Sequence, residues 1–568
     1  MIALLVLLGL VSVLWVLLVE SKPEVERGST LVVELSGGYV ESAESSLLAR
    51  LLGDGSRSFA SLLAELDKAA RDDRIEAVLF RVRDLNIGWA KAEELREALE
   101  LLGESGTRTA AFLELSDFSG NLEIFVASAA DSLYASPANS GLLLGLGAQY
   151  YFLGGFWERF GVDYEVEGIG RYKSAGEMLS KSEMSEPHRE MANSLLDSLN
   201  ERFVGGLAES RNLSAQQIEA VLAAPPATPG ALRERGIVDA VVAWDEAVER
   251  VGGGPLIEDF EYATVDARSV GFDPVARFAL VYGSGAVVMG NASMTPSGAP
   301  ELASDRVSAA LEDAAKDPSI DAIIFRVDSP GGSPLASEIV WRASQQARQA
   351  GKPLVASFSD TAASGGYYVA CGADAVVASA TSLVGSIGVF AMRPVVDRAF
   401  EKLDIGVATL TRGANADALM LAEPLTPSSR ALLRSAITQT YALFTERVAA
   451  GRGMSVDAVD RVAQGRVWTG AQAVTRGLVD VLGGLREATA VARQRVGLPR
   501  DADVELVPYP RSEGLQAQVS ALLRGASARL HPAVILPERL RRVGDWWLAT
   551  AAAAGSPQLL PPFLVEIH

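Results

Sequence analysis

The sequence has very few of the residues that form disulfides and metal centres. Its 568 residues include a single cysteine, Cys371, so an intrachain disulfide framework and a multi-cysteine metal site are both excluded. The three histidines stand at positions 188, 531 and 568, far from one another along the chain. This spacing argues against a histidine-rich metal centre, and we expect no metal site.

Basic residues are also in short supply. Lysine and arginine total 51 against 71 aspartates and glutamates, and the resulting net charge of −20 would repel a phosphate backbone. We therefore expect no nucleic-acid partner. Only eight of the basic residues are lysines, and none follows Lys402. If the protein uses a neutral amine as a base, that amine must belong to one of these lysines, because arginine stays protonated.

Apolar sequence, in contrast, is abundant. Hydrophobic residues make up 49% of the chain, which excludes general disorder. The length of 568 residues exceeds that of one ordinary domain of ~100–200 residues, so we expect at least two domains. Residues 2–19 form an unbroken apolar run that nearly spans a hydrocarbon core of ~30 Å. We expect residues 1–21 to be a transmembrane signal anchor, with the rest of the chain outside the cytoplasm. A cleaved signal peptide is the alternative, although residues 17–20 lack the small residues of a cleavage site.

The chain repeats itself at an interval of about 240 residues. Three pairs of segments match in the same order, with spacings of 245, 243 and 241: RIEAVLFRV (74–82) with SIDAIIFRV (319–327), VASAAD (126–131) with VACGAD (369–374), and RGIVD (235–239) with RGLVD (476–480). Collinear matches of this kind predict a tandem duplication.

Each copy has the pattern of an α/β domain. Apolar segments such as 77–82 and 322–327 alternate with amphipathic stretches such as 304–316 and 336–350. This alternation predicts a mostly parallel sheet covered by helices. We place the repeats at 29–265 and 275–498, the connector at 252–274, and a tail at 499–568 that could be associated with the membrane.

Two glycine-rich turns follow strands of the second copy only. Residues 328–333 read Asp-Ser-Pro-Gly-Gly-Ser, and residues 359–368 contain Ala-Ser-Gly-Gly-Tyr-Tyr around Ser364. A serine at a helix start can simply cap the helix. It can also be a nucleophile whose neighbouring N–H groups bind an oxyanion. Alignment of the copies puts Asn121 opposite Ser364, as expected for one working and one retired site.

A nucleophilic serine needs a base, and the histidines do not fit that role. A buried lysine can serve if its pKa falls from ~10.4 toward ~7–8. In the second copy, Lys316 and Lys352 lie near a helix end and a strand start, where we predict solvated charges. In the first copy, Lys173 lies among glycine, tyrosine and small residues (168–178). The second copy thus supplies the candidate nucleophile, and the first copy supplies the candidate base.

These motifs together resemble the signal peptide peptidases of peptidase family S49, in their long, duplicated form. The resemblance rests on the two turns, on Gly-Ser-Ile-Gly-Val at 385–389 and on Arg-Tyr-Lys-Ser-Ala at 171–175, and it covers roughly residues 29–498. It implies two crotonase-like (caseinolytic-protease-like) ββα domains, no cofactor, and a homotetramer. It also implies a periplasmic Ser/Lys protease, anchored in the inner membrane of bacteria, that degrades remnant signal peptides and other extended apolar peptides.

The resemblance also implies roles for individual residues. Ser364 would be the nucleophile and Lys173 the general base, and Ser386 would hydrogen-bond the lysine. Gly332 and Gly365 would donate the N–H groups of the oxyanion hole. Two alternatives stay open: a non-catalytic membrane scaffold, and an enzyme of the same fold that processes acyl-CoA thioesters.

Overall fold

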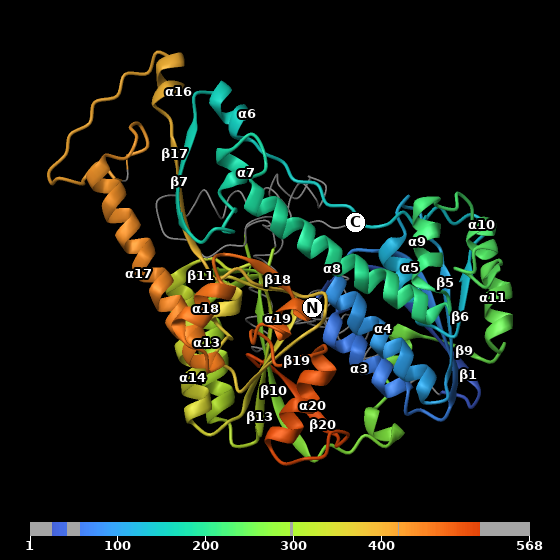
Figure 1. The fold of residues 1–568 in the computed structure, drawn as a ribbon. Helices are drawn as coiled ribbons and strands as arrows, with labels where there is room; N and C mark the ends of the chain where they lie inside the picture. The colour runs from blue at the N-terminus through green and yellow to red at the C-terminus, as the bar shows by residue number, and fades with distance from the viewer. Residues whose placement is uncertain (1–24, 42–56, 293, 296–298, 419, 512–568) are drawn as a thin grey trace, which may run out of the picture.

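A computed structural model describes residues 25–41, 57–292, 294–295, 299–418 and 420–511 (Figure 1). The predicted membrane anchor at 1–21 and the tail from residue 512 onward lie outside the described residues. Within the described ranges, no helix combines the length and apolar character that a membrane crossing requires. We call residues 25–275 the N-terminal half and residues 276–511 the C-terminal half.

The N-terminal half contains a six-stranded parallel sheet. The strand order is β8-β6-β5-β4-β1-β9, with bounds β1 (Ser29–Gly37), β4 (Ile75–Leu85), β5 (Arg108–Leu113), β6 (Ser132–Ala135), β8 (Ala240–Val241) and β9 (Leu256–Glu258). Its central strands are buried on both faces, which explains their nearly continuous apolar sequence. Helices α3 (Phe59–Ala69), α4 (Trp89–Glu104) and α5 (Asn121–Ala127) pack onto it.

The C-terminal half repeats this strand order in its parallel strands, as β19-β15-β14-β13-β10-β20. Their bounds are β10 (Ala276–Ser284), β13 (Ala322–Ser329), β14 (Leu354–Ala363), β15 (Ala375–Ala378), β19 (Val481–Leu482) and β20 (Val504–Tyr509). A branch is added where the end of β14 pairs with β16 (Leu383–Gly385), which pairs antiparallel with β18 (Val467–Thr469). Helices α13 (Ser304–Lys316) and α14 (Pro334–Gln349) cover one face, and α20 (Leu485–Arg495) covers the other.

The mixed α/β fold predicted from the alternating pattern is confirmed. The amphipathic stretch 304–316 is helix α13, and the apolar segment 322–327 lies within strand β13. The sheet of the C-terminal half extends past the predicted boundary at residue 498, because β20 pairs with β10. The predicted connector 252–274 contains β9, which pairs with β1 and so belongs to the first sheet.

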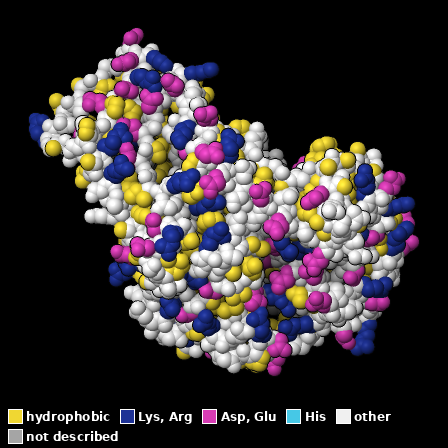
Figure 2. Space-filling view, viewed as in Figure 1, with side chains coloured by type: hydrophobic (Ala, Val, Ile, Leu, Met, Phe, Trp, Pro, Cys, Tyr) yellow, Lys and Arg dark blue, Asp and Glu magenta, His cyan; other side chains and the backbone are white. Residues whose placement is uncertain are grey.

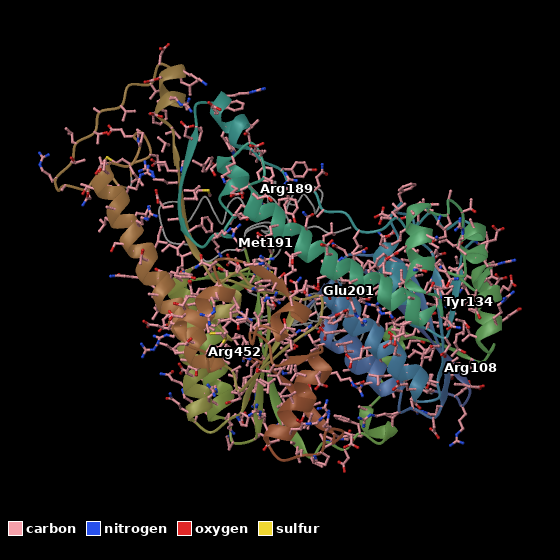
Figure 3. All side chains as sticks on the ribbon, in the orientation of Figure 1. Arg108, Tyr134, Arg189, Met191, Glu201 and Arg452 are labelled. Atoms are coloured by element: carbon pink, nitrogen blue, oxygen red, sulfur yellow. The ribbon has the colours of Figure 1, made fainter. Side chains whose placement is uncertain are left out.

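A strand pair and a long helix are among the elements that join the halves. Strand β7 (Asp163–Ile169) of the N-terminal half pairs antiparallel with β17 (Val389–Val395) of the C-terminal half, and the two form a ribbon that projects beyond both sheets (Figure 1). Helix α8 (Glu186–Ser210) runs from near this ribbon back to the first sheet, and carries Met191 and Glu201 (Figure 3). Met191 packs with Val467 of the C-terminal half, whereas Phe203 belongs to the N-terminal core.

The remaining described elements are short strands, short helices and the long helix α17. Their bounds are β2 (Tyr39–Val40), β3 (Arg57–Ser58), α6 (Gly154–Arg159), α7 (Glu177–Ser180), α9 (Ala215–Ala223), α10 (Pro229–Glu234), α11 (Trp244–Val251), α12 (Asp259–Tyr262), η1 (Ala267–Val270), β11 (Ala286–Val288), β12 (Glu301–Ala303), α15 (Gly365–Tyr368), α16 (Asp397–Lys402), α17 (Pro427–Arg452), α18 (Val456–Val462) and α19 (Gly470–Val474). Figure 2 shows acidic and basic side chains intermingled over the visible face, so the negative net charge is not gathered in one patch there.

Candidate active site

Three polar side chains from distant parts of the chain meet in a buried cluster. The Nζ atom of Lys173 lies 2.8 Å from Oγ of Ser364 and 2.9 Å from both the carbonyl oxygen and Oγ of Ser386. All three residues are buried. A neutral amine has two N–H groups and one lone pair. The two N–H groups can be donated to Ser386, which leaves the lone pair directed at the hydroxyl of Ser364.

The β7–β17 ribbon accounts for this meeting. Its register places Ile169 opposite Val389, so the chain that leaves β7 runs beside the chain that enters β17. Lys173 follows β7, and Ser386 precedes β17. Ser364 joins them because its N–H donates to the carbonyl of Gly385 at 2.7 Å, next to Ser386. The pairing of the two halves thus assembles the cluster within one chain.

Glycines let the backbones around Lys173 approach closely. Gly465 has φ +75°, and a Cβ atom there would lie 2.6 Å from both Cβ and the backbone N of Lys173. A Cβ atom on Gly170 would lie 2.6 Å from the backbone of Gln464. Residues 464–465 of the C-terminal half therefore pack directly against the loop 170–173 of the N-terminal half, which we call the lysine loop. Only glycine fits at positions 170 and 465.

Burial gives Lys173 the electrostatics of a base. Removal from water disfavours the ammonium form and holds the pKa of Lys173 well below its usual range. Its nearest polar partners are the two serines, which carry no charge. A larger fraction of this lysine is therefore neutral near pH 7 than of a solvated lysine.

Both serines adopt backbone conformations that are uncommon for residues with a side chain. Ser364 has φ 56° and ψ −116°, and Ser386 has φ 52°. Such conformations cost free energy and persist where the surroundings enforce them, often at functional sites. Ser364 stands at the sharp turn between β14 and α15, so its hydroxyl is directed at Lys173.

Two backbone N–H groups lie beside Ser364. A Cβ atom on Gly365 would come within 3.0 Å of the amide nitrogen of Gly332, so the two turns are in contact. Within the described part of the chain, neither the Gly332 nor the Gly365 amide donates a hydrogen bond to another backbone group. Ser333 caps α14 through the N–H of Ala336, so the helix begins directly after Gly332. The arrangement leaves two donors for a developing oxyanion.

The position of the N-terminal half that corresponds to Ser364 is occupied by Asn121, which has structural hydrogen bonds. Asn121 begins α5, and its Oδ1 accepts the N–H groups of Leu144 and Gly145 at 2.8 and 3.1 Å. Its Nδ2 donates to the carbonyl of Gly145 at 2.9 Å. A side chain held in this way has no free nucleophile, in agreement with the predicted loss of this copy's site.

The structure thus brings together all five residues singled out in the sequence, namely Lys173, Gly332, Ser364, Gly365 and Ser386. The prediction that two other lysines are solvated holds for one of them. Lys316 pairs with Glu312 on the surface as predicted. Lys352 is not freely solvated, because its Nζ donates to the carbonyl oxygens of Asp317 and Ile320.

Sequence reasoning missed a further buried lysine, Lys91, and gave no role to two acidic residues near the turns. Lys91 of α4 contacts Asp328 on strand β13 and Asp360 on strand β14, each shortly before one of the two turns. The available signal was the scarcity of lysine together with an aspartate four positions before each of Gly332 and Ser364. His188 is buried in α8, with Nδ1 3.4 Å from Glu177, and is not part of the cluster around Ser364.

Comparisons with known proteins identify the family of the chain. The pattern described as Peptidase family S49 matches residues 113–253 and 346–499. The chloroplastic serine protease SPPA of Arabidopsis thaliana is 32% identical over 498 residues, which cover 86% of this chain and 72% of that protein. Protease 4 of Haemophilus influenzae is 30% identical over 404 residues, covering 67% of this chain and 64% of that protein.

Shorter and more distant matches extend the comparison. An Enterococcus faecium protein that carries signal peptide peptidase in its name is 32% identical over 168 residues, covering 30% of this chain and 49% of that protein. Among solved structures, a membrane-bound stomatin-specific protease in complex with a substrate peptide matches at 17% identity and a TM-score of 0.26, covering 44% of this chain and 98% of that one. The family pattern and the two longest of these matches decide the assignment: the chain belongs to peptidase family S49 and is a serine endopeptidase.

Proposed function

We propose that the protein is a Ser/Lys endopeptidase, with Ser364 as nucleophile and Lys173 as general base, that degrades remnant signal peptides and other extended apolar peptides. The observation that carries the proposal is the contact of 2.8 Å between Nζ of Lys173 and Oγ of Ser364 in a buried site. Relatives named as proteases and as a signal peptide peptidase support the substrate class.

Acylation follows from this geometry. The lone pair of neutral Lys173 takes the proton of the Ser364 hydroxyl as Oγ attacks the carbonyl carbon of the peptide bond. The carbonyl oxygen becomes an oxyanion, which the N–H groups of Gly332 and Gly365 stabilise. The Lys173 ammonium then gives its proton to the leaving amine, and the C–N bond breaks. Water hydrolyses the acyl ester on Ser364 by the same steps, with Lys173 again as base.

The membrane anchor, the location and the assembly belong to the same proposal. The apolar run at 2–19 supports an anchor at 1–21 in a bacterial inner membrane, with the catalytic part on the periplasmic side. The shared strand order of the two sheets supports a tandem duplication of a crotonase-like domain. A homotetramer is proposed from the family resemblance alone, and sedimentation of the detergent-solubilised protein would test it.

The proposal predicts the pH dependence of the reaction with a serine-directed fluorophosphonate. The labelling rate should rise with pH through one ionisation, whose midpoint lies below the ordinary lysine pKa of ~10.4 because burial lowers the pKa of Lys173. Rates measured between pH 5 and 11, with Ser364→Ala as the unlabelled control, would check this. A profile flat over the whole range would contradict a lysine base, as would one governed by a histidine-like step near ~6.5.

The bracing of the lysine loop predicts the effect of Gly465→Ala. The added methyl group must displace the backbone of Lys173, and a shift of about 1 Å at a catalytic group can reduce the rate about 10²-fold. We expect kcat/KM for a peptide ester to fall by that order. The matched control is Gly497→Ala, because Gly497 has a similar φ of +78° and nothing within 4 Å of the added methyl. Equal activities of the two variants would show that the close contact at Gly465 does not hold Lys173.

A further inference from the structure

A second buried lysine joins the two halves next to the active site. Lys91, in α4 of the N-terminal half, directs its Nζ at the C-terminal half, 2.7 Å from Oδ2 of Asp328 and 2.6 Å from Oδ2 of Asp360. The same Nζ lies 2.9 Å from Oε1 of Glu41 and 3.0 Å from Oγ of Ser359. One ammonium group thus contacts three carboxylates.

The two aspartates stand at equivalent points of neighbouring strands. Asp328 lies on β13, four residues before Gly332, and Asp360 lies on β14, four residues before Ser364. Oδ1 of Asp328 also accepts the N–H of Thr361 at 3.1 Å, which ties β13 to β14 at this level. The proposed oxyanion-hole turn and the nucleophile turn therefore both begin at carboxylates that one cation holds.

Helix α4 is docked on the same strands by its N-terminus. Oδ1 of Asp360 accepts the backbone N–H groups of Ala90 and Lys91, each at 3.1 Å, and so caps a helix whose own N-cap residue, Gly88, has no capping side chain. A Cβ atom on Gly88 would lie 2.2 Å from Cγ of Asp360. The start of α4 therefore packs so closely against Asp360 of β14 that no space is left for an added methyl group.

A second buried cation lies beside this cluster, and it is the carboxylates that keep Lys91 ionised. Arg326 of β13 pairs with Glu41 at 3.0 Å and with Glu94 of α4 at 2.6 Å. Burial alone would lower the pKa of Lys91, but Asp328, Asp360 and Glu41 together raise it well above its usual range. Burial raises the pKa of Asp328, which the charge of Lys91 offsets in part.

Lys173 and Lys91, both buried in the N-terminal half, therefore have opposite properties. Lys173 contacts uncharged serines and its pKa is lowered, which suits a base. Lys91 contacts carboxylates and remains a cation, which suits a fixed electrostatic link.

We propose that Lys91 is a positioning residue that holds the oxyanion-hole turn and the nucleophile turn in register through Asp328 and Asp360. The inference rests on the proposed function of Ser364 and Gly332. Loss of the cation would leave carboxylates buried without a counter-charge, and the ends of β13 and β14 would shift relative to each other. The distance between Oγ of Ser364 and the N–H of Gly332 would then no longer suit a tetrahedral oxyanion, whereas the Lys173–Ser364 contact would persist.

The test compares Lys91→Met with Lys68→Met in the full-length protein. Lys68 is a matched control, because it is also buried in the N-terminal half but donates to the carbonyls of Tyr262 and Val265, away from the turns. Rates are normalised to the fraction of molecules that fluorophosphonate labels at saturation. Lys91→Met should then lower kcat for a peptide ester about 10- to 100-fold. This loss is smaller than the 10²- to 10³-fold loss caused by removal of a whole oxyanion donor. KM should stay within about twofold.

Two further readouts separate positioning from general stability. A peptide aldehyde adds to Oγ of Ser364 and places its oxygen in the oxyanion hole, so its affinity should fall in proportion to kcat. The pH midpoint of kcat/KM should not move, because Lys173 is untouched. An unchanged normalised kcat in Lys91→Met would overturn the inference, as would an equal loss in Lys68→Met.

If Lys91→Met does not fold, Gly88→Ala gives a second route to the same answer. Its methyl group would displace Asp360 while Lys91 stays in place, and we expect kcat to fall with KM unchanged. Gly205→Ala, with nothing within 4 Å of its added methyl, is the control. Full activity of Gly88→Ala would overturn the inference. Failure of the proposed function is seen separately, as activity that persists in Ser364→Ala.

Discussion

Ser364→Ala is expected to lower kcat by on the order of 10⁶-fold, as removal of the nucleophile does in other serine proteases. The reason is that Oγ of Ser364 forms the covalent acyl intermediate, and alanine offers no nucleophile in its place. The fold should be retained, because alanine keeps the backbone of the turn and only one hydroxyl is lost. Peptide-ester turnover, fluorophosphonate labelling and the urea unfolding midpoint would be measured together.

Ser344→Ala provides the control for that experiment. Ser344 is also buried, but its Oγ donates to the carbonyl of Trp341 and accepts from Nε2 of Gln345, both within α14. This variant should retain wild-type turnover and labelling. Near wild-type turnover in purified Ser364→Ala would show that the nucleophile is another residue.

Lys173→Arg should be almost as inactive as Lys173→Met, with kcat/KM lowered about 10²- to 10⁴-fold, the range that a general base contributes. Arginine preserves the positive charge, but it stays protonated and cannot accept the proton of Ser364. The comparison therefore separates a lysine that acts as a base from one that only supplies charge. Substantial turnover by Lys173→Arg would assign the base to another group.

Lys173→Met should also differ from wild type in its free energy of unfolding. Because the pKa of folded Lys173 is lowered, the folded chain binds its proton less readily than the unfolded chain does. The wild type is therefore destabilised below the unfolded lysine pKa of ~10.4, increasingly as the pH falls toward the folded pKa, and constantly below it. Lys173→Met should be at least as stable as wild type at pH 7, and this advantage should shrink as the pH approaches ~10.4. Urea unfolding at pH 7 and pH 10 would measure it.

Much of this protein could be predicted from local sequence pattern. The α/β fold followed from alternating apolar strands and amphipathic helices, since each element's periodicity is written in consecutive residues. The turn around Ser364 could be singled out because a sharp strand-to-helix turn needs small residues next to one another. Lys173 could be singled out because so few lysines were available to choose from.

The sequence by itself therefore determined the class of fold and singled out Ser364 and Lys173, because both depend on residue type and local pattern, whereas the family resemblance pointed to Ser386, Gly332 and Gly365. Only the tertiary structure decided how the parts meet. The β7–β17 pairing brings Lys173 to Ser364 across 191 positions of sequence, and Lys91 reaches Asp360 across 269. Burial then sets the pKa values of the two lysines in opposite directions. No local pattern encodes this difference, because the pKa of a buried amine depends on the charges that the folded chain places around it.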